Sequence, residues 1–416
     1  MTPSAPQAIS DDPAAVVGAG PVGLIAALAL ARRGVRTLVL EAEAQQRIRP
    51  GSRAIVLALP TTHRIDTVLP GLGGRIRAAG IGVSGYDAFY EGRRIFLHRS
   101  EHGVLGRIAR TDRLLTSLPQ RVTEGFLYEA CVREGVEFRW ESPVSTMETG
   151  DGGVDLTLAS GETISATYVI GADGARSAVR RAIGATMTGH TDDTPFIIVD
   201  VEAHPDGSTP LMPGHFYYRE PRVDGRNVMH MPFQGGMRVD LQCTADDDAD
   251  YLASPDGVRD WTSRIIDPWY GEHITWISTY RFHQVVADTY TDPHRRVLLA
   301  GEAAHLFAPW GGRGLNSGVL DATDAARAIA AALSAPSRAT AHRAIGRCAA
   351  YRRAWGLRNR DVSSRALRIM RAPDRSTRLR RDLAARLAPA CWPAAAWLAN
   401  GPLQLPGPRL GSTDLY

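Results

Sequence analysis

The spacing of hydrophobic residues changes along the chain, and each change predicts a different structural element. Residues 14–17 form an apolar run typical of a buried strand, and helical spacing follows from about residue 22 to residue 33. Gly34 ends this predicted helix, and residues 36–40 form a second apolar strand that stops at Glu41. The segment therefore predicts a β-α-β unit with two parallel strands.

Further patterns predict a hairpin, a helix and several strands before residue 186. A hairpin is expected over residues 86–98, with its turn at Glu91-Gly92. Residues 118–134 have helical spacing and are followed by a short strand. Residues 154–170 alternate around a turn at Ser160-Gly161. These elements fit one domain that continues the β-α-β unit.

Residues 186–290 differ from the rest because polar and apolar positions alternate over several segments separated by Gly, Pro and Asp. Such alternation predicts an antiparallel sheet inserted into the first domain. An apolar strand near residue 297 returns the chain to that domain, and a helix is expected over residues 320–333. Residues 341–416 are expected to form terminal helices and a tail.

A glycine motif between the first strand and helix carries the first chemical signal. Gly18, Gly20 and Gly23 form GxGxxG, in which the first glycine allows a tight turn, the second admits a pyrophosphate, and the third allows close helix packing. Glu41 lies 23 positions after Gly18, where an acid can accept hydrogen bonds from an adenosine ribose. The motif predicts dinucleotide binding and by itself does not choose between NAD and FAD.

Two later segments narrow the choice. "GADGARSAVR" places Asp173 and Gly174 directly after a strand, and "GEAAHLFAPWGGRGLNSG" places Glu302 at the mouth of another strand before a glycine cluster. Glu302 can accept hydrogen bonds from the ribityl hydroxyls of a flavin. The glycines at 311, 312 and 314 leave the backbone bare enough for a flat ring to lie against it.

Composition narrows the chemistry further. The 416 residues include 48 basic ones, all arginine, so mechanisms that need a lysine, such as Schiff-base catalysis or a Walker-type phosphate site, are excluded. The composition of a GC-rich genome explains this bias better than selection at each site does, and the exclusion holds either way. The four cysteines are far apart, so neither a disulfide framework nor a metal site is predicted. The arginines crowded over residues 342–382 are expected to be solvated helix faces, and the net charge of +4 indicates no nucleic-acid partner.

These motifs, in this order, resemble the single-component FAD-dependent aromatic hydroxylases, the family of para-hydroxybenzoate, hydroxyphenylpropionate and phenol hydroxylases. The resemblance covers residues 14–327. It implies an α/β protein with a Rossmann-like FAD-binding domain, an inserted antiparallel sheet that selects the substrate, and C-terminal helices. The implied domains are 1–185 and 291–340 for FAD, 186–290 for substrate, and 341–416 for the helices and tail.

The resemblance also implies roles for individual residues. Those expected to contact the cofactor are Gly18, Gly20, Pro21, Val22, Gly23, Glu41, Ala42, Arg53, Gln120, Asp173, Gly301, Glu302, Pro309, Gly312, Gly314, Leu315 and Asn316. Backbone N–H groups of Leu315 and Asn316 at a helix start are expected to stabilise the negative charge of reduced flavin.

One position departs from the family pattern. The family usually has aspartate where this chain has Glu302, which is one methylene longer. We therefore expect FAD binding to be adjusted or weakened there, with the function retained.

The reaction implied by the resemblance is hydroxylation of a phenolic or polyketide-like aromatic substrate. NADH or NADPH would reduce FAD, and O2 would form a flavin C4a-hydroperoxide that attacks the ring. His230 and Tyr217 are candidates to deprotonate a phenol. Arg238 is expected to bind an anionic group or to form a structural ion pair, and the carbonyl of Pro309 is expected near the substrate. His305 is expected to be structural or to lie near the flavin.

Several alternatives stay open from the sequence. The same chemistry could serve epoxidation or Baeyer-Villiger oxidation, the protein could be a flavin dehydrogenase, or it could be a non-enzymatic redox module. The chain has no signal peptide or membrane-length apolar run, so a cytoplasmic protein without a membrane partner is expected, as a monomer or homo-oligomer. The thioredoxin-like domain of longer phenol hydroxylases is not expected.

Overall fold

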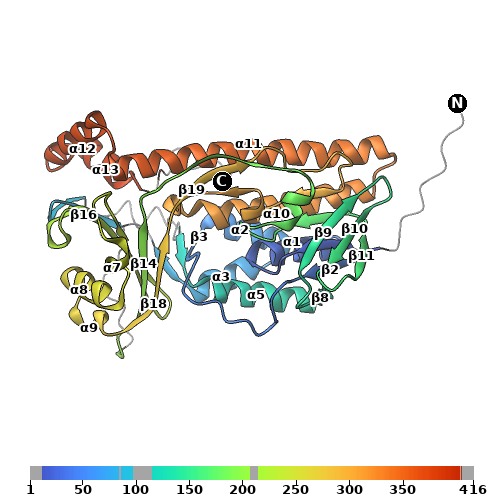
Figure 1. Ribbon diagram of the computed structural model, residues 1–416, viewed down its shortest axis with the longest axis horizontal. Helices are drawn as coiled ribbons and strands as arrows, with labels where there is room; N and C mark the ends of the chain where they lie inside the picture. Colours follow the sequence, from blue (N-terminus) through green and yellow to red (C-terminus); the bar gives the residue numbers. More distant parts are fainter. Residues whose placement is uncertain (1–11, 84–85, 97–114, 207–213, 403, 405–416) are drawn as a thin grey trace, which may run out of the picture.

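A parallel sheet forms the centre of the larger part of the molecule. The structure is a computed structural model that describes residues 12–83, 86–96, 115–206, 214–402 and 404 (Figure 1). Five strands are arranged in the order β20-β12-β1-β2-β8, and every pair is parallel. Their bounds are β1 (Ala14–Val17), β2 (Thr37–Leu40), β8 (Glu137–Arg139), β12 (Val169–Gly171) and β20 (Val297–Leu299). Four of these five strands are fully buried, as expected for a parallel sheet covered on both faces.

Long helices cover this sheet. Helix α1 (Pro21–Ala31) packs against α10 (Arg313–Leu333) and α5 (Gln120–Arg133), and α10 also packs against α11 (Arg338–Arg371). A Cβ built on Gly23 would lie 1.8 Å from the carbonyl oxygen of Gly18, so only glycine permits this approach of helix and turn. α11 runs along the upper side of the molecule in Figure 1, with α12 and α13 beyond its left end.

A second, seven-stranded sheet has the order β18-β14-β17-β16-β15-β5-β6. Its strands are β5 (Tyr86–Tyr90), β6 (Arg93–Phe96), β14 (Phe196–Glu202), β15 (Gly214–Glu220), β16 (Arg226–Phe233), β17 (Gly236–Gln242) and β18 (Ile274–Tyr280). The expected hairpin forms β5 and β6, turns at Glu91 and Gly92, and joins this sheet through a parallel pairing of β5 with β15. The sheet is therefore antiparallel except at that pair, and it draws on the chain before residue 186.

Three smaller sheets complete the β structure of the described residues. They consist of β9 (Val144–Thr149), β10 (Val154–Leu158) and β11 (Thr163–Ala166); of β13 (Met187–Thr191), β19 (His283–Ala287) and β21 (His305–Leu306); and of β3 (Val56–Ala58), β4 (Ile81–Val83) and β7 (Leu115–Ser117). The remaining helices are α2 (Leu59–Val68), α3 (Leu72–Ala79), α6 (Ala178–Ala182), α7 (Ala249–Leu252), α8 (Pro255–Ile265), α9 (Pro268–Gly271), α12 (Arg375–Leu387) and α13 (Trp392–Ala399). Short 3-10 turns cover Pro221–Val223, Gly301–Ala303 and Trp310–Gly312. Among the described helices, none is long and apolar enough to span a bilayer.

Helix α10 begins seven residues before the expected start at residue 320. Gly311 and Gly312 adopt positive φ angles of 77° and 63°, and Gly312 is the N-cap. The glycine cluster is thus the turn into a helix. Gly318 lies inside the helix, where a larger residue would not fit because its Cβ would approach Val22 to 2.6 Å.

Candidate functional site

One cavity of about 430 Å³ lies where the carboxyl ends of β1 and β12 meet the starts of α1 and α10. This is the edge of an open parallel sheet where ligands bind in α/β folds. It is lined by thirteen of the residues expected to hold the cofactor, namely Gly18, Gly20, Pro21, Val22, Glu41, Ala42, Arg53, Gln120, Asp173, Gly301, Glu302, Gly314 and Leu315. Segments far apart in the sequence therefore share one cavity.

The glycine turn after β1 presents bare backbone to this cavity. Gly18 has a φ of 102°, and a Cβ there would lie 2.5 Å from the carbonyl oxygen of Ala172. Gly20 is the N-cap of α1 and provides no side-chain cap, and Pro21 follows as the first helical residue. An uncapped helix N-terminus leaves N–H groups free and favours a negatively charged ligand.

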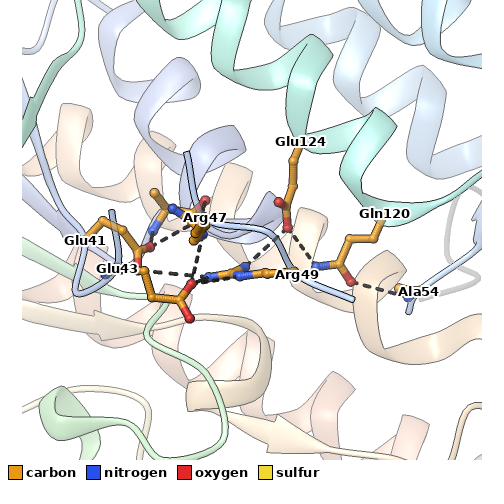
Figure 2. Close-up of polar contacts among 8 residues, drawn as sticks. Glu41, Glu43, Arg47, Arg49, Ala54, Gln120 and Glu124 are labelled. Atoms are coloured by element: carbon orange, nitrogen blue, oxygen red, sulfur yellow. Dashed lines mark hydrogen bonds and ion pairs between the residues drawn. The ribbon is translucent and has the colours of Figure 1, made fainter. Parts of the chain in front are cut away.

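Glu41 fixes the geometry of this turn as well as lining the cavity. Its side chain is buried, and its two oxygens accept hydrogen bonds from the backbone N–H groups of Ala19 (2.5 Å) and Glu43 (3.0 Å). Arg47 lies 3.5 Å from the same carboxylate (Figure 2). The acid thus joins the end of β2 to the glycine turn.

Arg49 is a cavity residue that the sequence analysis did not single out. Its guanidinium pairs with Glu43 at 2.9 Å and with Glu124 at 3.4 Å (Figure 2). Gln120 donates to Glu124 at 2.8 Å and accepts from the backbone N–H of Ala54 at 3.3 Å. Gln120 therefore helps to fix this loop while lining the cavity. The only sequence signal for Arg49 was its place among the arginines that follow Glu41.

Arg53 lines the cavity in a left-handed backbone conformation, with a φ of 53°. Such a conformation is unfavourable for a residue other than glycine and needs support from its surroundings. The support comes from the preceding residue, because Ser52 is bound by the carboxylate of Asp200 in β14. Arg238 in β17 also donates to the hydroxyl of Ser52 at 2.7 Å.

Asp173 lines the cavity, but its carboxylate is occupied by the start of α6. It accepts hydrogen bonds from the hydroxyl of Ser177 (2.5 Å) and from the N–H groups of Ala178 and Val179 (2.6 and 3.1 Å). The buried Arg180 donates to the carbonyl oxygen of Ala303 at 3.1 Å. The Asp-Gly segment is therefore tied to the loop that carries Glu302.

A buried ion-pair network holds the other side of the Glu302 loop. Asp321 in α10 accepts from the N–H of Gly301 (3.2 Å), from His305 (2.7 Å) and from Arg352 of α11 (2.7 Å). Burial alone would raise the pKa of Asp321, but Arg352 and His305 outweigh it and lower the pKa below its usual value. His305 is thus a buried partner of Asp321. The Glu302 side chain is exposed to the cavity.

The start of α10 supplies the second uncapped helix terminus, since its N-cap Gly312 makes no side-chain cap. Gly314 and Leu315 line the cavity, and a Cβ on Gly314 would meet nothing within 4 Å. Asn316 is fully buried and spans to β3, where it accepts from the N–H of Ala58 (2.9 Å) and donates to the carbonyl of Val56 (3.0 Å).

The structure does not bring four of the expected cofactor residues to the cavity wall: Gly23, Pro309, Gly312 and Asn316. Gly23 packs against the glycine turn, and Asn316 anchors α10 to β3. The carbonyl of Pro309, expected near the substrate, accepts a hydrogen bond from the N–H of Gly312 at 2.8 Å and closes the turn before α10.

Two expected catalytic residues lie on the other face of the seven-stranded sheet. Tyr217 and His230 share that face with Val228 and Val239, in the core that also contains α8. The hydroxyl of Tyr217 contacts His215 at 3.0 Å and His230 at 3.4 Å. Burial lowers the pKa of His230, so the ring is neutral. Because Arg238 and Ser52 mark the opposite face, the sheet separates this group from the cavity.

Arg238 forms a structural ion pair, which was one of its two expected roles. Its guanidinium lies 3.5 Å from Asp200 and 4.0 Å from Asp240, and all three side chains are buried. Burial is the main reason that the pKa of Asp240 rises to about 7. This charged group connects the inserted sheet to the loop of Arg53.

Comparisons with known proteins agree with this geometry. A sequence model of the FAD binding domain family matches residues 11–345. The para-nitrophenol 4-monooxygenase of Pseudomonas sp. (strain WBC-3) is 30% identical over 77% of this chain and 78% of its own. The chain belongs to the single-component FAD-dependent aromatic hydroxylase family.

Other members of this family extend the likeness. A 3-(3-hydroxy-phenyl)propionate/3-hydroxycinnamic acid hydroxylase of Mycobacterium sp. (strain JLS) is 28% identical over 80% of this chain, which spans only 56% of that relative. The crystal structure of p-nitrophenol 4-monooxygenase PnpA from Pseudomonas putida DLL-E4 is 26% identical, with a TM-score of 0.76 over 93% of this chain and 96% of that one. The structure of the Diels-Alderase PyrE3 is 25% identical, with a TM-score of 0.68. The match covers 95% of this chain and 81% of the PyrE3 chain.

The cavity residues fit FAD, the cofactor of this family. The two uncapped helix starts face one cavity, so one can receive a pyrophosphate and the other the polar edge of a flavin ring. Gly314 leaves open space where a flat ring can approach the backbone. The family membership makes this chain a flavoprotein of the monooxygenase type.

Proposed function

We propose that this protein hydroxylates a small phenolic or polyketide-like aromatic compound, using FAD, O2 and either NADH or NADPH. The observation that carries the proposal is the single cavity shared by Glu41, Asp173 and Gly314, which come from three separate segments. When bound, FAD would supply the transfer of electrons from the nicotinamide to O2. The protein residues would bind and orient the cofactor and keep water from the reacting atoms.

Each end of the cavity suits a different part of FAD. Glu41 and the start of α1 would hold the adenosine ribose and the pyrophosphate, and Arg49 would add positive charge beside Gly20. Glu302 would accept hydrogen bonds from the ribityl chain, and the N–H groups of Gly314 and Leu315 would face the ring.

Apolar side chains next to the start of α10 support an aromatic substrate. Ile55, Leu115, Met231, Phe233 and Leu320 form a buried cluster that joins the small β3-β7-β4 sheet, the inserted sheet and α10. Val56 packs against this cluster and lies close to Gly312. Apolar surroundings favour an aromatic ligand and exclude water, and we propose that the substrate lies beside this cluster.

Gly314 offers a direct test of the cavity as the flavin site. The Gly314→Ala variant adds a methyl group where nothing in the protein obstructs it, so the protein should fold while FAD binding weakens at least tenfold. The measurement is quenching of flavin fluorescence during titration of the apoprotein. Gly125→Ala is the matched control, because Gly125 is exposed on α5 and its Cβ would also meet nothing within 4 Å.

The activity is tested on the reconstituted protein with a panel of phenols under air. NADH and NADPH oxidation, hydroxylated product and H2O2 are measured together. Donor oxidation that a phenol stimulates, with product formed in proportion, is the expected result. A protein that binds FAD and consumes no donor with any phenol would refute the hydroxylase proposal, and would direct attention to a non-oxidative role such as that named for PyrE3. A colourless protein that takes up no FAD would refute the cofactor assignment itself.

A further inference from the structure

A second pocket lies far from the flavin cavity, between the inserted sheet and the C-terminal helices. Its volume is about 290 Å³, and it shares no lining residue with the flavin cavity. The walls come from the ends of β15, β16 and β17, from the junction between α11 and α12, and from the first turns of α12. In Figure 1 this is the end of the molecule where α12 and β16 are labelled.

Arginine dominates the wall of this pocket. Five arginines line it, and no Asp or Glu is among its lining residues. These arginines are Arg219, Arg226, Arg371, Arg378 and Arg381. Buried amide side chains of Asn227 and Gln242 complete the polar wall, and Asn227 donates to Gln242 at 2.8 Å.

Three of the five arginines have acidic partners outside the pocket. The pairs are Arg226 with Asp247 at 2.7 Å, Arg219 with Glu91 at 3.2 Å, and Arg371 with Asp192. Arg226 also reaches Asp224 at 2.8 Å, and Arg219 lies 3.6 Å from Asp382. These acids hold the three guanidinium groups in place and compensate their charge.

The other two arginines, Arg378 and Arg381, have no carboxylate within 4 Å among the described residues. Arg381 is only 4% exposed, although the sequence predicted solvated arginines in this region. One terminal nitrogen donates to the carbonyl of Met370 at 2.7 Å, while its buried Nε has no hydrogen-bond partner in the described chain. Its guanidinium also lies near the rings of Tyr90 and Tyr218, at 5.7 and 5.8 Å, and interacts with the neutral hydroxyl of Tyr90.

A buried guanidinium without a carboxylate is unfavourable, because the ring faces and one carbonyl compensate only part of its lost hydration. Proteins pair such a group with an anion, and the planar guanidinium fork fits the oxygens of a phosphate or carboxylate. The two arginines without a carboxylate partner, Arg378 and Arg381, favour a group with two negative charges over one with a single charge. That charge is typical of a phosphate group.

We propose that this pocket binds a phosphate group, either free phosphate or the phosphate of a small ester. Arg378 and Arg381 contact the anion directly, and the ion-paired Arg226 and Arg371 form the wall beside them. The site is separate from the flavin cavity and does not depend on the proposed reaction.

The test uses the full-length protein saturated with FAD, so that the pyrophosphate site at α1 is filled. Inorganic phosphate and 5′-AMP are titrated separately by calorimetry, with chloride at matched ionic strength as the background. Saturable binding of at least one probe is expected, and the tighter probe identifies free phosphate or a phosphate ester as the source. The flavin absorbance spectrum should not change during the titration.

Two variants locate the site. Arg378→Gln removes an exposed charge without breaking an ion pair and should weaken phosphate binding at least fivefold. Arg386→Gln, an exposed arginine on the same helix outside the pocket, is the matched control and should bind as the wild type does. Arg381→Met should abolish binding and fold without phosphate, because it removes an unpaired buried charge.

The proposal is overturned if neither probe binds above the chloride background, or if Arg378→Gln and Arg381→Met both bind phosphate like the wild type. If the protein takes up no FAD, the same titrations on the apoprotein still give either answer.

Discussion

The carboxylate of Asp200 accepts hydrogen bonds from both the backbone N–H and the hydroxyl of Ser52, at 2.5 and 2.8 Å. This contact joins the middle of the inserted sheet to the loop in which Arg53 lines the flavin cavity. The sheet that is expected to cover the substrate therefore also sets the backbone of a cofactor-binding loop. We therefore expect a substrate bound at this sheet to affect the position of the cofactor through this carboxylate.

Replacing Asp200 should loosen this loop. In Asp200→Asn one carboxylate oxygen is replaced by an NH2 donor, so the N–H or the hydroxyl of Ser52 loses its acceptor. Arg238 also loses the nearer of its two acidic partners. We expect a loss of roughly 1–3 kcal/mol in the free energy of unfolding and about tenfold weaker FAD binding. Thermal unfolding and flavin titration measure the two effects. Asp155→Asn is the control, since Asp155 accepts from Ser165 in an exposed hairpin; equal losses in both variants would contradict the coupling.

The longer acid at position 302 can be tested by shortening it. Glu302→Asp should keep FAD binding or tighten it, because the cavity accepts the aspartate that the family usually carries there. Glu302→Ala should weaken binding, because the ribityl hydroxyls lose their acceptor. Dissociation constants from fluorescence titration decide the matter. If Glu302→Asp abolishes binding, the site has been rebuilt around glutamate.

The Asp321 network should contribute stability at neutral pH. The pKa of Asp321 is lowered in the folded protein, so its stabilising effect is present above the unfolded pKa of about 4 and is lost as the pH falls through the folded value. Asp321→Asn leaves Arg352 buried and poorly paired, and should cost roughly 3–5 kcal/mol at pH 7. Urea unfolding at pH 7 and at pH 3 measures this cost, which should shrink at the lower pH. An unchanged cost at both values would contradict the assigned charges.

Asp240 should show the opposite dependence. Its pKa is raised to about 7 in the folded protein, so ionisation of Asp240 opposes folding. The protein is therefore most stable while Asp240 is protonated, and it loses stability as the pH rises from about 4 toward 7. Asp240→Asn should therefore unfold like the wild type near pH 4 and be more stable at pH 8, by about 4 kcal/mol at most. Thermal unfolding across this range is the measurement. A variant less stable than the wild type at pH 8 would mean that the charge of Asp240 is needed to compensate Arg238.

Several elements were predictable because their signals are local. The first strand was predicted at Ala14–Val17 and lies there, and the hairpin turns at Glu91 and Gly92, where Gly92 supplies the positive φ that glycine favours. The predicted start of α10 was seven residues late, since glycines that usually interrupt a helix here begin it. Gly318 is retained inside this helix because it packs closely on Val22, a contact between distant segments that the local sequence does not reveal.

The sequence was a poorer guide to which face of a strand meets the cavity and to which charged side chains are buried. Alternation in β15 and β16 correctly separated the side chains into two sets but could not say which set faces the cavity, so Tyr217 and His230 were interpreted as catalytic candidates. Likewise, the arginine-rich helices gave no sign that Arg381 is buried, because its burial depends on the rings of Tyr90 and Tyr218, which belong to the seven-stranded sheet.

The sequence by itself determined the glycine turn, the acid after the second strand and the family to which they belong, because short-range backbone geometry specifies these features. Only the tertiary structure decided which carboxylates are left for a ligand. Asp173 is engaged by a helix start, Asp321 by a buried arginine, and Glu302 faces the cavity. The physical reason is that a side chain's partners come from residues far away in the chain, and pairing determines whether a charge serves the fold or a ligand.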